Sequence, residues 1–184
     1  MKKLRLGIFG MRRGFDYLDA AEMNGFTVTA VCDADETRLA AAKERLPAAA
    51  VFTDPEAFLQ SPMDAVFLAN FFHEHAFWAI RFLEKGVHVL SECASNATMA
   101  QGVQLARAAE KSGAVYMLAE NYPFMLFNRE MKRVYEGGTL GKALYAEGPP
   151  RCVPPSGGPP RSPGDRPRKT SRSRCGDDPD LSWL

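Results

Sequence analysis

A first group of residues whose types and spacing suggest chemistry lies in the first 33 positions. An apolar run over 4–9 ends in a turn that begins at Gly10, and a second apolar run ends in Asp33. A glycine turn between a strand and a helix presents backbone N–H groups to a pyrophosphate, and an acid about 20 residues later holds the ribose hydroxyls. This pattern predicts a dinucleotide-binding βαβ unit. The candidate cofactor contacts are Gly10, Met11, Arg12, Arg13 and Asp33.

The glycine turn departs from the G-x-G-x-x-G fingerprint of such units. With Gly10 as the first glycine, Arg12 stands at the second glycine position and Phe15 at the third. Two plainer interpretations therefore stay open: a strand-to-helix turn that needs positive φ, and an Asp33 that only caps the next helix. The two arginines are either phosphate contacts or solvated surface charges.

A second group of candidates follows the predicted fourth strand. Asn70 and His75 flank the turn there, and in a doubly wound sheet the ligand crevice lies outside the carboxyl ends of the strands. His75 is a candidate for a place beside the nicotinamide. The alternative is a histidine in the first turn of a helix whose ring is satisfied by local hydrogen bonds.

Strands and helices alternate along the first two thirds of the chain. β-branched and apolar runs predict the strands, helical apolar spacing predicts the helices, and glycines or prolines separate them. This alternation predicts an α/β fold with a doubly wound parallel sheet and right-handed crossovers. A linker helix over 124–135 and one further strand over 140–147 follow. The predicted strands are 4–9, 27–32, 50–52, 64–69, 87–91 and 115–119, and the main helices are 15–24, 36–46, 75–85 and 98–112.

Composition restricts the class of protein further. A net charge of +1 over 184 residues gives no reason to expect a nucleic-acid partner, and no apolar run reaches the ~18 residues of a membrane span. The N-terminus lacks the pattern of a signal peptide, so we expect a cytoplasmic protein without membrane association. Four widely spaced cysteines indicate neither a disulfide framework nor a zinc site.

The C-terminal stretch 149–184 differs from the rest of the chain. It holds nine of the 13 prolines and seven Lys or Arg against four acids. Because it has few apolar residues to offset the entropy of ordering, we expect it to be disordered. Its composition is also that of a GC-rich gene read out of frame, so the chain is a candidate fragment with a frameshift after 148.

Several segments together resemble the Gfo/Idh/MocA family of oxidoreductases. They are GIFGM, VTAVCDADETRL, DAVFLANFFHEHAFWAIRFLEKGVHVLSE, AENYPF and GGTLGKALYAEG, in the order and spacing of that family. The resemblance implies an NAD(P)-binding Rossmann domain over 1–121. It also implies that 122–148 form the linker helix and first strand of a truncated substrate domain.

The resemblance adds three candidates at the nicotinamide end, namely Glu92, Cys93 and Asn121. The family commonly reads E-K-P after its fifth strand, with the lysine near the nicotinamide, whereas Cys93 stands at that lysine position. A buried, inert thiol is the competing interpretation of Cys93. No catalytic residue and no metal ligand is assigned. Because the Asp33 carboxylate would repel a 2′-phosphate, NAD is favoured and NADP stays open as an alternative.

By this resemblance, the expected function is nucleotide binding within an NAD-dependent oxidoreductase that acts on a sugar, cyclitol or similar polyol. We expect the chain alone to be inactive, since the substrate domain that would bind the polyol in a full-length form is missing. The competing hypotheses are a non-catalytic NAD-binding module and an interaction module. A homo-oligomer is a further expectation.

Overall fold

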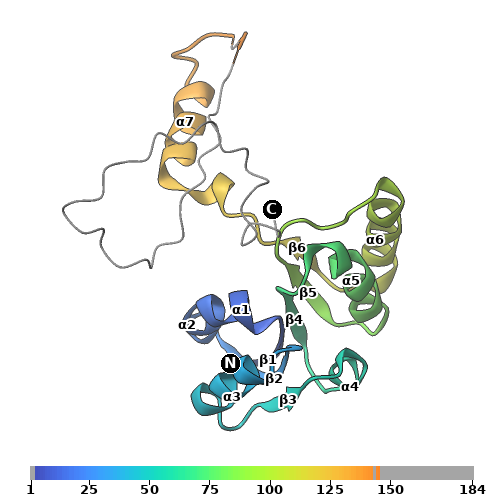
Figure 1. Ribbon diagram of the computed structural model, residues 1–184. Coiled ribbons are helices and arrows are strands. Elements are labelled where there is room, and N and C mark those ends of the chain that lie inside the picture. The colour runs from blue at the N-terminus through green and yellow to red at the C-terminus, as the bar shows by residue number, and fades with distance from the viewer. Residues whose placement is uncertain (1–2, 143, 146–184) are drawn as a thin grey trace, which may run out of the picture. The chain divides into compact units, whose positions relative to one another are not determined.

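The computed structural model describes residues 3–142 and 144–145, and the chain divides into two units, Met1–Glu120 and Asn121–Leu184. The first unit contains a six-stranded sheet in the order β3-β2-β1-β4-β5-β6, and all of its strand pairs are parallel (Figure 1). Each predicted strand of this unit is confirmed to within two residues. The strands are β1 Leu4–Phe9, β2 Phe26–Cys32, β3 Ala50–Phe52, β4 Ala65–Leu68, β5 His88–Ser91 and β6 Tyr116–Leu118.

Helices cover both faces of this sheet, and each face has its own apolar core (Figure 1). Because side chains alternate along a strand, Ile8 of β1 packs toward one face and Phe9 toward the other. One core contains side chains from α1 Met11–Gly14, α2 Leu18–Met23 and α3 Glu36–Arg45. The other collects α4 Pro55–Leu59, α5 His75–Glu84 and α6 Met99–Ser112. This is the two-faced burial that the apolar strands predict.

Local sequence signals explain where most of these helices begin and end. The side chains of Asp35 and Asp54 accept backbone N–H groups at the start of α3 and α4. Thr98 and Gln101 form a reciprocal capping box at the start of α6, and Gly113 closes that helix at a φ of 68°. Caps of this kind satisfy backbone groups that the helix leaves unpaired, so they fix the ends of the segments that carry the site.

The first helical segment differs from the prediction over 15–24. The backbone turns into α1 directly after Gly10, then passes through the 3-10 turn Phe15–Tyr17 into α2. Gly14 allows this early start, since a Cβ at that position would lie 2.6 Å from Cγ2 of Ile8. Gly14 therefore allows the close packing of α1 on β1.

The second unit begins with the 3-10 turn Tyr122–Phe124 and continues as α7, Leu126–Glu136. The helix predicted over 124–135 is confirmed, and its role as a linker stays a prediction. The strand predicted over 140–147 is wrong for the residues that the structure describes, 140–142 and 144–145, which form a turn and irregular backbone. A strand needs a partner for its backbone groups, and no neighbouring strand is present among them. The predicted disorder of 149–184 lies outside the described residues.

Candidate functional site

Gly10 fixes the turn at the carboxyl end of β1. Its φ is 96°, and a Cβ there would lie 2.3 Å from the carbonyl oxygen of Ala69 and 2.5 Å from the backbone nitrogen of Asn70. The Gly10 N–H donates to the carbonyl oxygen of Cys32 at 2.8 Å. Only glycine combines this backbone conformation with this approach. The turn thus brings together the ends of β1, β2 and β4, where the strand order of the sheet reverses.

Asp33 lies at the end of β2 and is 6% exposed. Its Oδ2 accepts the backbone N–H of Met11 at 2.6 Å, and its Oδ1 accepts that of Asp35 at 2.9 Å. The guanidinium of Arg38 lies 3.4 Å from the same Oδ1. The carboxylate therefore anchors the glycine turn to the start of α3. Sequence reasoning missed this role, because the Met11 N–H that it binds carries no side-chain signal.

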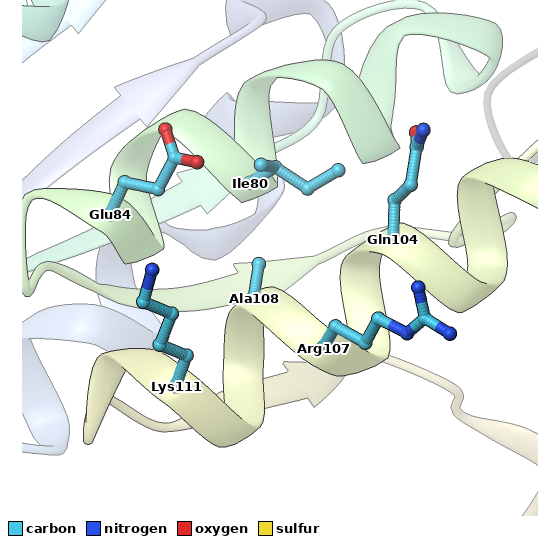
Figure 2. A pocket seen from close by; sticks show the side chains of 6 residues that line it. All are labelled: Ile80, Glu84, Gln104, Arg107, Ala108 and Lys111. Atoms are coloured by element: carbon cyan, nitrogen blue, oxygen red, sulfur yellow. The ribbon is translucent and has the colours of Figure 1, made fainter.

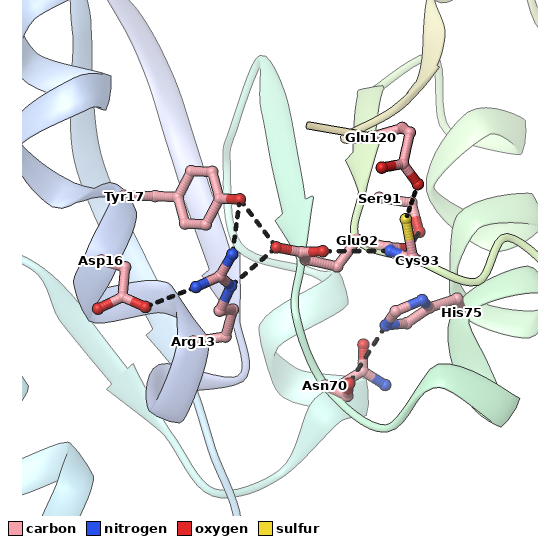
Figure 3. A network of polar contacts seen from close by, with 9 residues as sticks. All are labelled: Arg13, Asp16, Tyr17, Asn70, His75, Ser91, Glu92, Cys93 and Glu120. Atoms are coloured by element: carbon pink, nitrogen blue, oxygen red, sulfur yellow. Dashed lines mark hydrogen bonds and ion pairs between the residues drawn. The ribbon is translucent and has the colours of Figure 1, made fainter. Parts of the chain in front are cut away.

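The two arginines of the turn have different surroundings. Arg12 is exposed, and the described residues offer it neither a hydrogen bond nor an ion pair. Arg13 instead donates from Nε to Oε1 of Glu92 at 2.9 Å and from Nη1 to Oδ2 of Asp16 at 2.9 Å (Figure 3). Its guanidinium also lies over the Tyr17 ring, 5.3 Å from the centroid. Arg13 is thus part of a network, and Arg12 is the cation that this turn leaves exposed.

Glu92 connects the turn after β1 with the end of β5. Its side chain is 15% exposed, and its Oε1 accepts both Arg13 Nε and the Tyr17 hydroxyl, the latter at 2.8 Å (Figure 3). Its Oε2 accepts the backbone N–H of Cys93 at 3.2 Å. Burial opposes the charge of Arg13, but the hydrogen bonds to Glu92 and Asp16 outweigh it and raise the pKa of Arg13. The Arg13 guanidinium therefore stays charged across the working pH range of proteins.

Cys93 follows Glu92 and is half-buried. Its Sγ donates to Oε2 of Glu120 at 3.1 Å, a contact between the segments after β5 and β6 (Figure 3). Burial, together with the neighbouring Glu120 carboxylate, raises the pKa of Cys93 to about 11. A neutral thiol with this partner is a weak nucleophile, as thiolates are the reactive form.

The loop after β4 holds His75 and Asn70 in place. His75 is 1% exposed, with Nδ1 2.9 Å from the carbonyl oxygen of Ala94 and Nε2 3.2 Å from that of Asn70. A neutral imidazole donates through one nitrogen only, so one of these two contacts is a hydrogen bond in that form. The side-chain nitrogen of Asn70 donates to Glu74 at 3.0 Å, while its Oδ1 is buried without a partner. A buried acceptor of this kind remains available to a ligand.

Asn121 belongs to the second unit, where it is exposed and precedes the turn Tyr122–Phe124. The other candidates from the sequence all lie at the carboxyl ends of β1, β2, β4 and β5 within the first unit. Three residues that the sequence did not single out as site residues, Tyr17, Asp16 and Glu120, join their hydrogen-bond networks. The only signal in the sequence for these three residues is their position, since each follows β1 or β6.

Two surface cavities lie elsewhere in the first unit. One, of about 350 Å³, lies between α5 and α6, as Figure 2 shows. The other, of about 520 Å³, is lined by residues around the start of β2 and the end of α3. None of the candidate residues lines either cavity. Among the described residues there is no cluster of three potential metal ligands, and no helix there has the length and apolar character needed to cross a membrane.

The parallel sheet with strand order 321456 and a glycine turn at its point of reversal defines a Rossmann domain of the dinucleotide-binding class. Residues 4–120 match the sequence model of a family described as "Oxidoreductase family, NAD-binding Rossmann fold", under the name GFO_IDH_MocA. The chain belongs to this Gfo/Idh/MocA family, as its sequence motifs predicted. Because the chain belongs to this family, the carboxyl edge of the sheet described above is expected to bind a nucleotide.

Individual relatives share part of the chain. It is 30% identical over 146 residues to D-glucoside 3-dehydrogenase of Escherichia coli (strain K12), covering 76% of this chain. It is 28% identical over 157 residues to glycosyl hydrolase family 109 protein 1 of Bacteroides fragilis, covering 79%. A solved structure of the WlbA dehydrogenase from Bordetella pertussis in complex with NADH and UDP-GlcNAcA superposes with a TM-score of 0.70 at 24% identity.

The chain spans only part of each of these proteins. It covers 41% of the E. coli relative, 34% of the B. fragilis relative and 43% of the WlbA chain, while 76% of this chain is matched in the last comparison. The shared part contains the Rossmann domain. The activities of the full-length relatives are therefore only proposals for this chain.

Proposed function

We propose that the carboxyl edge of the sheet binds NAD, with its pyrophosphate against the turn Gly10–Gly14. The observation that carries this proposal is the turn at Gly10, where a Cβ would fill the space against the backbone of Ala69 and Asn70. This glycine lets the turn pass directly against the end of β4, at the point where the strand order reverses and dinucleotides bind, and the exposed guanidinium of Arg12 supplies a positive charge. Family membership supports the same assignment.

The residues at the ends of β4 and β5 would hold the nicotinamide half of the cofactor. The unpartnered Oδ1 of Asn70 is a buried acceptor, and the carboxamide of nicotinamide is a donor of matching chemistry. His75 holds the backbone on which Asn70 lies, and Glu92 holds Arg13 at the end of β5. In this proposal Asn70 is a direct contact, while His75 and Glu92 are positioning residues.

We further propose that a longer form of this protein transfers hydride between the nicotinamide and a hydroxyl-bearing carbon of a sugar or related polyol. The bound cofactor accepts or donates the hydride, and the protein orients it. The dehydrogenase and the nucleotide-sugar complex among the compared proteins support a sugar. The glycosyl hydrolase relative supports an alternative reaction, in which the same site cleaves a glycosidic bond.

The 184-residue chain alone is proposed to bind the cofactor without turning over a polyol. Cys93 stands where the family has a lysine, and its neutral thiol, donating to Glu120, offers no cation to a substrate oxygen. This also favours the second candidate function, a non-catalytic NAD-binding module. Measurable dehydrogenase activity of the purified chain on any polyol would contradict both statements.

NADH binding is testable by titrating the intrinsic fluorescence of NADH with the purified chain. A saturable change in the micromolar to millimolar range is the expected result, and Asn70→Ala should weaken it about tenfold as one buried hydrogen bond is lost. Asn128→Ala, in α7 of the second unit, is the matched control and should leave binding unchanged. No saturable signal in the native chain would remove the cofactor proposal.

A further inference from the structure

Asp33 is poorly available to clamp a ribose. Clamping the 2′- and 3′-hydroxyls requires acceptor positions on both carboxylate oxygens. Oδ1 of Asp33 already accepts from Asp35 N and lies 3.4 Å from Arg38 Nη1, and Oδ2 accepts from Met11 N. A carboxylate oxygen has two lone pairs, so one acceptor position on Oδ2 remains. The side chain is moreover only 7% exposed.

The charge of Asp33 is also compensated within the fold. Arg38 reaches it from α3, and the Arg38 Nε lies 3.4 Å from Oδ2 of Asp35. Both distances are at the outer limit for such contacts, and the Arg38 side chain is 40% exposed. The guanidinium is therefore held loosely between two carboxylates, with N–H groups left over for a further acceptor, since it carries five.

This position is where a 2′-phosphate would lie. In a dinucleotide-binding sheet the adenosine ribose lies outside the carboxyl end of the second strand, and an arginine near that end accommodates the phosphate of NADP. Arg38 is the one guanidinium that contacts the strand-end acid in the described part of the chain. The contacts of Arg38 with Asp33 and Asp35 show that its side chain faces the end of β2.

We infer that Arg38 determines the nucleotide specificity of this site and that the chain accepts NADP with an affinity within about tenfold of that for NAD. The inference rests on the proposed cofactor site. Arg38 lessens the repulsion expected from Asp33, because the buried carboxylate is already paired with a cation that has N–H groups left for the added phosphate. Asp35 remains the opposing charge, which limits the preference for NADP and leaves both cofactors usable.

The test titrates NADH and NADPH separately into the native chain, Arg38→Gln and Arg45→Gln. Arg45 is the matched control, because it is an exposed arginine at the opposite end of the same helix, paired with Asp19. We expect Arg38→Gln to weaken NADPH at least tenfold and NADH less than threefold, and Arg45→Gln to change neither by more than threefold. Circular dichroism melts check that each variant is folded.

A competition experiment needs no variant. In the native chain 2′,5′-ADP, which carries the extra phosphate, should displace NADH at least as well as 5′-AMP. The inference is overturned if NADH binds but NADPH is more than about tenfold weaker, or if Arg38→Gln weakens both cofactors equally, and the proposed function survives either result. If neither cofactor binds, the proposed function itself fails and the inference fails with it.

Discussion

Replacing Gly10 by alanine tests what the turn after β1 requires of this residue. The turn needs either both the positive φ of glycine and the absence of a Cβ, or the positive φ alone. Gly113 supplies the comparison, because it also has a positive φ, 68°, and a Cβ there would meet nothing within 4 Å. An alanine in this region of the Ramachandran map costs about 1–2 kcal/mol. Gly113→Ala should therefore lower the free energy of unfolding by about that amount.

Gly10→Ala carries at least this backbone cost, because the ψ of 92° at Gly10 lies outside the left-handed region that Gly113 occupies, and it adds a collision. Its Cβ would lie 2.3 Å from the carbonyl oxygen of Ala69, which is backbone at the end of β4 and cannot rotate away. Overpacking that forces a backbone shift costs about 1–3 kcal/mol more. The total of about 2–5 kcal/mol is a large part of the stability of a domain. We expect the melting temperature to fall by ~15 °C for Gly10→Ala and by ~5 °C for Gly113→Ala.

Urea denaturation followed by circular dichroism at 222 nm measures both losses, and an NADH titration on the folded variants measures the effect on binding. Gly10→Ala should abolish saturable binding, whereas Gly113→Ala should retain it. The reasoning is refuted if the two variants unfold at the same urea concentration, because the Ala69 contact would then cost nothing. It is equally refuted if folded Gly10→Ala binds NADH as the native chain does.

Three further predictions concern the acids and the thiol of the same edge. Asp33→Asn replaces one charged acceptor of the turn by a donor, so the free energy of unfolding should fall by about 1–3 kcal/mol in urea; an unchanged midpoint would contradict its anchoring role. Glu92→Gln weakens a partly exposed pair with Arg13 and should cost about 1 kcal/mol or less in the same assay; a larger loss would mean that this pair is not screened by solvent. Cys93 should react slowly with iodoacetamide at pH 8 and progressively faster toward pH 11, as peptide mapping by mass spectrometry would show. Glu120→Gln should lower the pKa of the thiol and raise the rate at pH 8, and equal rates would disprove the contact. Because the unfolded thiol ionises near pH ~8.5 and the folded one near 11, its contribution to stability is lost as pH rises between these values.

The sheet was predictable because its signals are local and repeated. Strands such as 27–32 and 64–69 are mostly apolar or β-branched, and glycines or prolines separate them from helices with helical apolar spacing. The strand predicted over 140–147 is not formed by its described residues, 140–142 and 144–145, and shows the limit of such signals. Apolar residues there satisfy the strand pattern, but a strand also needs a hydrogen-bonded neighbour, which the local pattern does not report.

The sequence predicted where the site lies better than it predicted what each side chain does there. Asp33 was placed correctly at the end of β2, yet its carboxylate binds the Met11 N–H, a partner 22 positions away that no spacing rule names. Arg13 was considered for a phosphate, and its partner Glu92 lies 79 positions further along the chain. Such pairings depend on which strand ends are neighbours, and the strand order becomes known only with the fold.

The central place of β1 in the sheet has a consequence for how the chain acquires its fold. β1 pairs with β2 on one side and with β4 on the other, so Leu6 must find Ala65, and the Arg5 side chain pairs with Asp64 across 59 positions. Closing so long a loop costs entropy before its contacts form, which makes such sheets slow to fold. During synthesis β1 therefore emerges well before its second neighbour, and the nascent chain must keep an apolar strand half-paired until residue 68 has left the ribosome.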